Sequence, residues 1–204
     1  MTGHHSGEKI VLASNNVGKV REINQLLAGE RITVLAQKEY NIPDAIEDGL
    51  SFVENAIKKA RHASSLSGLP AIADDSGIEV EALNGAPGIY SARFAGPGAS
   101  DKANLEKLLE HLKEVPEADR GARFQCLMVY MRHAEDPTPI ICQGTWEGSI
   151  LFEPRGDNGF GYDPIFYVPT HDCSSAELPP EVKNRLSHRG QALQKLLQAL
   201  SQRL

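Results

Sequence analysis

The stretch IVLASNNVGKVREINQLL, residues 10–27, decides the fold class. A short apolar run, residues 10–13, is followed by a largely polar segment, residues 14–19. An amphipathic pattern comes next, with apolar residues at i, i+3, i+6 and i+7, which are Val20, Ile23, Leu26 and Leu27. This order predicts a β-strand, a tight loop over residues 14–19 and an α-helix whose N-terminus the loop covers.

The predicted loop is a candidate anion site. Backbone N–H groups and the positive end of the helix dipole meet at a helix N-terminus, and Ser14, Asn16 and Lys19 add hydrogen bonds and a charge. The loop is not a Walker A motif, because the first glycine and the Gly-Lys-Ser/Thr ending are missing. It therefore indicates triphosphate or base contacts of a different design. The alternative is an ordinary strand–helix turn with a solvated lysine.

Length and composition are those of a soluble globular protein. The 204 residues fit one large domain or two closely joined lobes, with 41% hydrophobic and 24% charged residues. No apolar stretch approaches the roughly 20 residues that span a bilayer. Residues 1–8 are polar and lack a signal-peptide core, so we expect a flexible extension or a remnant of protein expression.

Charge and cysteines limit the partners and the compartment. A net charge of −6 argues against a nucleic-acid polymer as partner, whereas a small anionic substrate needs only a few local cations. The three cysteines, Cys126, Cys142 and Cys173, form no CxxC pair, and the first two lie in apolar runs. Buried reduced thiols and a cytoplasmic location are therefore expected.

Strand and helix patterns alternate along the rest of the chain. Further strands are predicted at 32–36, 70–73, 124–131, 139–143 and 146–152, and further helices at 51–68, 100–116, 180–186 and 191–204. The strands 124–131 and 139–143 are expected to be antiparallel neighbours because a short polar turn joins them. The fold class is therefore mixed α/β, with parallel and antiparallel pairing.

Two adjacent carboxylates, Asp74 and Asp75, follow the predicted strand 70–73. The carboxyl ends of strands are where α/β proteins place ligands. In an extended backbone the two side chains would point to opposite faces, so only a turn, which Gly77 permits, would bring both to one metal ion. Oxygen ligands of this kind suit Mg²⁺. The alternative is a turn in which Asp74 or Ser76 only caps the backbone.

The segment before and within the predicted helix 51–68 adds candidates. Glu54 is explained by a capping box with Ser51, whereas Glu47 lies in a loop without a structural role and is the better metal ligand. Asn55 and Lys59 are four residues apart on one helix face, and both could address a phosphate.

Two motifs near the C-terminus are candidates for recognition of a base. The glycine-rich loop 156–163 allows close backbone approach, and Phe160 could stack on a nucleobase. The alternative is a turn whose Phe and Tyr enter the core. Ser187 can cap the last helix, which leaves His188 and Arg189 at its N-terminus. Basic residues at that position favour an anionic or carbonyl ligand.

Taken together and in order, these motifs resemble those of the Ham1/RdgB-type inosine triphosphate pyrophosphatases, which act on non-canonical purine nucleoside triphosphates. The resemblance runs from Lys9 to Leu200. Its motifs are Ser14-x-Asn16-x-x-Lys19, Glu54-Asn55-Ala56 with Lys59, Ala73-Asp74-Asp75-Ser76-Gly77, Gly159-Phe160-Gly161-Tyr162-Asp163 and Ser187-His188-Arg189-Gly190. The chain departs from the family in reading Ser14-Asn15-Asn16 where many members have Thr-Gly-Asn, and in its N-terminal extension.

The resemblance implies a fold and a reaction. The fold is a three-layer α/β/α structure with a long mixed sheet and a substrate cleft between two lobes. Residues 9–204 form one such domain, and two copies form a homodimer. The reaction is Mg²⁺-dependent hydrolysis of XTP, ITP and dITP to the monophosphate and pyrophosphate, which cleanses the nucleotide pool.

The resemblance also implies roles for individual residues. Asp75 corresponds to the catalytic base and to a Mg²⁺ ligand, with Glu47 as the second ligand. The residues that correspond to triphosphate contacts are Ser14, Asn15, Asn16, Val17, Gly18 and Lys19, with Lys59 nearby. Ser76 corresponds to a further substrate contact, and the wall that recognises the base consists of Phe160, Gly161, Tyr162, Asp163, Lys183, His188 and Arg189.

Base selectivity has a physical basis in this assignment. Hydrogen-bond donors near Ser187 to Arg189 would pair with a 6-keto oxygen and meet a second donor in adenine, and an unpaired polar group costs about 1–3 kcal/mol. Three other functions stay open: a Maf-like pyrophosphatase acting on modified pyrimidine nucleotides, a nucleotide-binding regulator without hydrolysis, and a structural α/β module.

Overall fold

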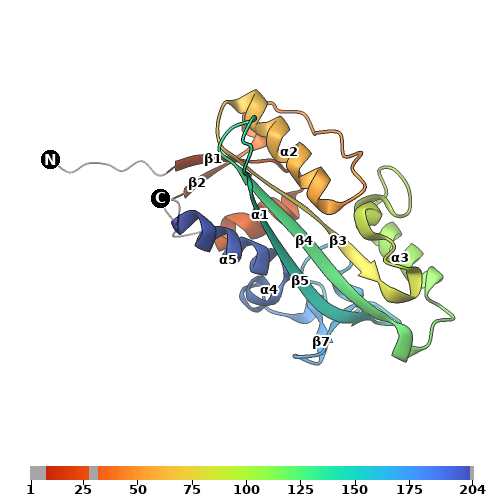
Figure 1. Ribbon diagram of the computed structural model, residues 1–204. Helices are drawn as coiled ribbons and strands as arrows, with labels where there is room; N and C mark the ends of the chain where they lie inside the picture. Colours follow the sequence, from red (N-terminus) through yellow and green to blue (C-terminus); the bar gives the residue numbers. More distant parts are fainter. Residues whose placement is uncertain (1–7, 28–31, 203–204) are drawn as a thin grey trace. The chain divides into compact units, whose positions relative to one another are not determined.

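The computed structural model describes residues 8–27 and 32–202. Most of the predicted extension, residues 1–7, lies outside them, while Glu8 already belongs to the first strand. Figure 1 shows the helices and strands. Their bounds are β1 (Glu8–Leu12), α1 (Val17–Leu26), β2 (Ile32–Ala36), α2 (Phe52–Ser67), β3 (Ala71–Val80), α3 (Asp101–His111), β4 (Gly121–Met131), β5 (Ile140–Ile150), β6 (Phe166–Val168), β7 (Cys173–Ser174), α4 (Pro180–Leu186) and α5 (His188–Ser201).

The strands form one mixed seven-stranded sheet in the order β2-β1-β3-β4-β5-β6-β7. β1 runs parallel to β2 and β3, and β6 runs antiparallel to β5 and β7. The predicted α/β class and mixed pairing are therefore confirmed. In the described part of the chain, no helix has the length and apolar character that crossing a membrane requires.

The chain groups into two compact units. Unit 1 contains the described residues of Met1–Asp75, Leu127–Cys142 and Lys195–Leu204, and unit 2 contains Ser76–Cys126 and Gln143–Gln194. Each has its own apolar cluster, so each is described separately. The substrate cleft expected from the family stays a prediction.

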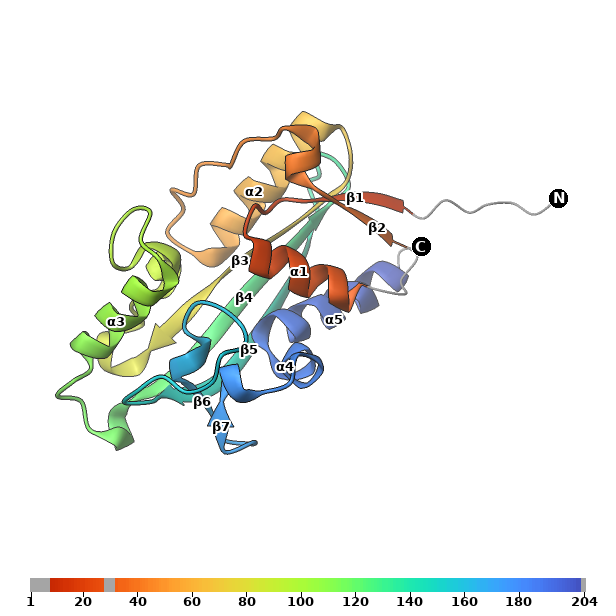
Figure 2. The ribbon, with the colours of Figure 1, turned by 180° about the vertical axis from the view of Figure 1, so that it is seen from behind.

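Unit 1 places helices on both faces of its strands. Figures 1 and 2, seen from opposite sides, show α2 in front of β1 and β3 in one view and α1 in front in the other. Small side chains of α2 face the sheet, where Ala56, Ala60 and Ala63 are fully buried against Val11 and Ala73. The absence of large side chains lets this helix approach the sheet closely. The position of the α2 backbone on the sheet then determines where the polar side chains of α2 lie.

Helix ends in both units follow the predicted caps. Ser51 accepts a hydrogen bond from the backbone N–H of Glu54, and Ser100 accepts one from Ala103 at the start of α3. Ser187 Oγ accepts from Gly190 N at 3.1 Å and so caps α5, as its position predicted. The caps at Ser51 and Ser187 begin the helices that carry Lys59, His188 and Arg189.

Unit 2 is built around a cluster of aromatic and aliphatic side chains. Leu105 and Leu108 of α3 pack in the same cluster as Phe124 of β4 and Trp146 of β5. Unit 2 also contains Arg120, which is 1% exposed. It donates to four main-chain oxygens at 2.6–3.3 Å, those of Leu112, Val115, Ile150 and Leu151.

α5 and β5 are in close contact in unit 2 at a glycine. A Cβ at Gly144 would lie 1.9 Å from the carbonyl oxygen of His188 and 2.8 Å from the backbone nitrogen of Ala192. Both atoms belong to the main chain of α5, so no side-chain rotation could relieve the clash. The first turn of α5 therefore rests directly on β5.

Several predicted boundaries are wrong: α3 ends at His111 rather than at 116, and α5 begins at His188 rather than at 191. Three further differences concern α1, β5 and β3. α1 begins at Val17 rather than after Lys19, because Asn16 caps it. β5 is one continuous strand where two were expected. β3 continues through Asp74-Asp75-Ser76-Gly77 to Val80, so the predicted turn does not exist. Gly77 is not among the described glycines with a positive φ, and residues 78 and 80 are buried against unit 2's core.

Candidate active site

The β1–α1 connection is built as a helix cap. Asn16 Oδ1 accepts from Lys19 N at 3.1 Å, and Ser14 Oγ accepts from Asn16 N at 3.2 Å. The cap occupies one N–H of the helix N-terminus, and the positive end of the dipole still favours an anion. Val17, which is 78% exposed, and Gly18 lie in the first turn, and so does Lys19.

Asn15 has a different role in the same loop. Its side chain donates to Asp44 Oδ1 at 2.7 Å, and Gln37 Nε2 donates to the same oxygen at 2.9 Å. Asp44 therefore ties the loop of Glu47 to the loop that follows β1. Sequence reasoning did not identify Asp44 or Gln37, since neither belongs to one of the motifs.

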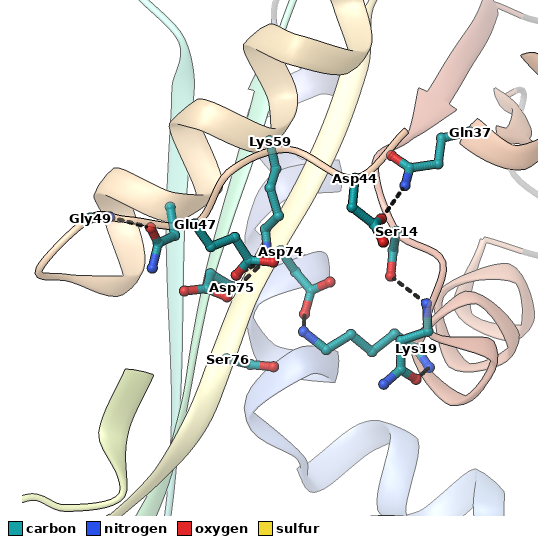
Figure 3. A network of polar contacts seen from close by, with 12 residues as sticks. Ser14, Lys19, Gln37, Asp44, Glu47, Gly49, Lys59, Asp74, Asp75 and Ser76 are labelled. Atoms are coloured by element: carbon teal, nitrogen blue, oxygen red, sulfur yellow. Dashed lines mark hydrogen bonds and ion pairs between the residues drawn. The ribbon is translucent and has the colours of Figure 1, made fainter. Parts of the chain in front are cut away.

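Five charged side chains of unit 1 form a group that we call the acid–lysine cluster: Lys19, Glu47, Lys59, Asp74 and Asp75. Lys59 Nζ lies 2.9 Å from Asp75 Oδ1 and 3.4 Å from Glu47 Oε2, and Lys19 Nζ lies 3.0 Å from Asp74 Oδ2 (Figure 3). The two carboxylates predicted as metal ligands are thus brought together by one ammonium group.

The two aspartates are held by different helices. Because successive side chains of an extended strand point to opposite faces, Asp74 meets Lys19 of α1 while Asp75 meets Lys59 of α2. β1 ends at Leu12, which pairs with Ile72 of β3, so both aspartates lie just beyond the carboxyl end of the neighbouring strand. The two aspartates therefore lie at the carboxyl end of a strand, as predicted. That strand is β1, because β3 continues past them.

The electrostatics keep Lys59 charged. Burial alone would lower the pKa of its ammonium group, but the carboxylates of Asp75, Asp74 and Glu47 outweigh that effect and raise the pKa above its ordinary value. A raised pKa means that the ammonium stays protonated throughout the neutral range.

The cluster fits a divalent cation that needs few protein ligands. No group of three Asp, Glu, His or Cys side chains that could hold a metal occurs among residues 8–27 and 32–202. Mg²⁺ is usually bound by one or two carboxylates together with substrate phosphates and waters. Asp75 Oδ2 is buried and has no hydrogen-bond partner among the described residues, so Asp75 and Glu47 offer a donor set of the right chemistry.

Asp163 organises the glycine-rich loop of unit 2. Its Oδ2 accepts from Lys183 Nζ at 2.6 Å and from Phe160 N at 2.8 Å, and its Oδ1 accepts from Ser175 Oγ at 2.9 Å. Gly159, at φ +80°, leaves no room for a side chain beside this carboxylate. Asp163 is therefore a buried anchor that fixes Phe160 and Lys183.

Phe160 is half-buried and lies near two cations. Lys183 Nζ is 5.2 Å and Arg189 Cζ is 5.7 Å from the centre of its ring. Arg189 also donates to Ser76 Oγ at 3.0 Å, which links the start of α5 to β3. The structure therefore brings together Ser76, Phe160, Asp163, Lys183 and Arg189, which we call the loop cluster.

The remaining predicted base contacts have other partners in unit 2. The ring of His188 stacks on Phe124 at 4.7 Å between centres, with an interplanar angle of 8°. Tyr162 belongs to the core of unit 2 and donates through its hydroxyl to Ser91 O at 2.7 Å. Gly161 N donates to Asp101 Oδ2 at 2.9 Å. For Tyr162 the alternative, a side chain that enters the core, is the correct one.

The mixed sheet and the paired lysines and carboxylates define an α/β protein with a candidate site for a phosphate-bearing ligand. A model of the Ham1 family matches residues 10–199, and a dITP/XTP pyrophosphatase from Vibrio cholerae is 61% identical over 195 residues, 96% of this chain and 98% of that protein. The chain belongs to the Ham1 family.

Solved structures agree with this assignment. A Ham1 protein from Coxiella burnetii has a TM-score of 0.89 and 52% identity, over 96% of this chain and 99% of that one. A nucleoside-triphosphatase / dITP/XTP pyrophosphatase from Mycobacterium abscessus has a TM-score of 0.73 and 40% identity, over 93% of this chain and 98% of that one.

Proposed function

We propose that this chain hydrolyses the non-canonical purine nucleoside triphosphates XTP, ITP and dITP to the monophosphate and pyrophosphate, and so cleanses the nucleotide pool. The observation that carries the proposal is the 61% identity, over nearly the whole of both chains, to a protein named a dITP/XTP pyrophosphatase. It favours this reaction over a Maf-like activity on pyrimidine nucleotides, a regulator without hydrolysis and a structural module.

The acid–lysine cluster supplies the catalytic groups in this proposal. Asp75 accepts the proton of a water whose oxygen attacks phosphorus, and the anhydride bond between the α- and β-phosphates breaks, which gives the monophosphate and pyrophosphate. Lys59, held protonated by its neighbours, and Lys19 neutralise charge on the phosphates. Residues 14–19 surround the triphosphate at the start of α1.

Asp75 and Glu47 would hold the Mg²⁺ ion. When bound, the ion would supply charge neutralisation for the phosphates and polarise their oxygens. Lys59 contacts both carboxylates and so holds them together for this purpose.

The loop cluster supplies base recognition in this proposal. Phe160 stacks on the purine, Lys183 and Arg189 face its edge with His188 beside them, and Ser76 and Gly161 contribute polar contacts. The location of these donors suits a 6-keto oxygen. Asp163 contributes by holding Phe160 and Lys183 in place.

The test is a pyrophosphate-release assay on ITP, XTP, dITP, GTP, ATP and dTTP with Mg²⁺, and with the metal removed by a chelator. The proposal expects the first three to be the best substrates and the chelator to abolish turnover. Preferential turnover of dTTP or another pyrimidine nucleotide would contradict it.

Base and phosphate recognition can be separated by two variants. His188→Ala is expected to lower kcat/KM for ITP much more than for ATP, whereas Lys19→Ala is expected to lower both by similar factors. Loss of the ring from its stack on Phe124 also costs stability, but the ITP/ATP ratio is measured on the same folded protein, so that cost cancels. If Lys19→Ala collapses the ratio and His188→Ala preserves it, base recognition is misplaced.

We also propose a single folding domain over residues 9–204, a homodimer and a cytoplasmic location. The family resemblance supports the first two, and the burial of Cys142 with the lack of cysteine pairing in the sequence supports the third. Light scattering across a concentration series would measure the oligomeric state.

A further inference from the structure

Asn55, whose spacing from Lys59 suggests that both could address a phosphate, is a buried polar residue without a role in the proposed function so far. It lies in α2 one helical turn before Lys59, so both side chains project from the same face of the helix. Its side chain is only 1% exposed. An amide in such a position must either be satisfied within the protein or have another reason for being there.

One end of this amide is satisfied by the loop that carries Glu47. Asn55 Oδ1 accepts from Gly49 N at 2.8 Å. Because a backbone N–H can only donate, this bond fixes the amide oxygen toward Gly49 and turns the NH₂ group away from it. The contact is tight, since a Cβ at Gly49 would lie 2.7 Å from Asn55 Oδ1 and 2.7 Å from Glu54 Cβ.

This hydrogen bond completes the anchoring of the loop. Asp44 is held before Glu47 by Asn15 and Gln37, and Gly49 is held after it by Asn55. Glu47 lies between the two anchors and meets Lys59. Asn55 therefore helps to determine where the predicted metal ligand lies.

The other end of the amide is unmatched. Nδ2 of Asn55 is buried and meets no hydrogen-bond acceptor among residues 8–27 and 32–202, and Asp75 Oδ2 is buried without a donor in the same way. Both of these unmatched atoms belong to unit 1. A cation would match the carboxylate oxygen, and an anionic oxygen would match the amide N–H. A phosphate bound together with a metal ion would supply both the cation and the anionic oxygen.

We propose that Asn55 contacts the substrate, with Oδ1 holding the Glu47 loop and Nδ2 donating a hydrogen bond to a phosphate oxygen. The inference rests on the proposed function for the presence of a triphosphate. The amide suits the position because it adds a donor without adding charge to a cluster in which two lysines already face three carboxylates.

The test uses inorganic triphosphate with Mg²⁺ as the probe. Asn55→Asp keeps the shape and the acceptor for Gly49 N but has no amide N–H. Its Kd for the probe, measured by calorimetry, is expected to rise about tenfold or more, since hydrogen bonds to charged groups are among the stronger ones. Its Kd for inosine is expected to change little, whereas the Tm of the unliganded protein is expected to fall, because the substitution buries a further negative charge. The added charge also repels the anionic probe, so an uncharged variant is needed beside it. Asn55→Ala, which lacks both groups, is expected to lose at least as much affinity for the probe.

Ser64→Ala is the matched control. Ser64 is also buried in α2 and donates to Leu69 O at 2.8 Å, so its loss lowers Tm without touching the acid–lysine cluster. Its Kd for triphosphate is expected to stay at the wild-type value. The proposal is overturned if both Asn55 variants bind triphosphate like the wild type, or if they weaken inosine as much as triphosphate.

The outcomes also separate this inference from the proposed function. Inorganic triphosphate has no base, so its Kd reports on Asn55 whichever nucleotide is the substrate. Wild-type protein that releases no pyrophosphate from ITP would overturn the proposed function, while a raised Kd for triphosphate in both Asn55→Asp and the uncharged Asn55→Ala would still support the phosphate contact.

Discussion

Asp75→Asn is expected to reduce pyrophosphate release from ITP by about 100-fold or more while the protein remains folded. The change removes a negative charge from the group proposed to accept the proton of the attacking water. The amide can still accept from Lys59 through Oδ1, where the carboxylate now lies at 2.9 Å, so the packing of β3 against α2 survives. Initial rates together with thermal unfolding measure both effects.

Asp48→Asn is the matched control for this variant. Asp48 lies in the same loop as Glu47, is exposed, and pairs with Lys58 on the outer side of α2. Its replacement removes one acidic charge from the same loop and is expected to leave turnover unchanged. Near-normal turnover in Asp75→Asn would place the catalytic base elsewhere.

Gly144→Ala is expected to destabilise the protein by about 2–3 kcal/mol, the cost of overpacking a rigid contact. The added methyl would lie 1.9 Å from His188 O, so α5 must shift away from β5. For a chain of this length we expect Tm to fall by about 5–10 °C. The shift also moves Arg189, which holds Ser76, so kcat/KM for ITP is expected to fall as well.

Gly121→Ala serves as the comparison. At the start of β4 the nearest atoms to an added Cβ belong to the flexible side chain of Glu81, at 2.9 Å, which can rotate away. This variant is expected to unfold close to the wild-type temperature. Equal Tm values for the two variants would show that α5 does not rest on β5 as described.

Patterns of apolar spacing and helix caps were sufficient to predict most of the fold. The caps at Ser51, Ser100 and Ser187 lie where the residue types indicate, because a cap is a local interaction between a side chain and the next turn. The course of β3 could not be predicted in this way. Whether Asp74 to Gly77 form a turn or a strand depends on the neighbouring strand and on the core beneath Ile78 and Val80, which are distant in sequence.

The candidate site was also predictable only where the interactions are local in sequence. The sequence showed that Lys59 and Asp75 are charged residues on consecutive predicted elements. In the structure they form an ion pair. The split of Asp74 and Asp75 between two helices follows from the continuation of β3, and was therefore missed. The internal role of Asp163 was missed as well, because three donors from residues 160, 175 and 183 converge on it only in the folded chain.

Arg120 has a consequence for how unit 2 tolerates changes of sequence. Its guanidinium donates hydrogen bonds to main-chain oxygens at positions 112, 115, 150 and 151, and it lies over the ring of Phe152 at 4.2 Å. Every residue type carries that oxygen, so substitutions at these four positions can leave the contact intact as long as the backbone keeps its course. The hydrogen bonds depend on the side chain at position 120, where lysine could not reproduce the planar set of donors. In a saturation mutagenesis library selected for folding, we expect position 120 to accept far fewer replacements than 115 or 151.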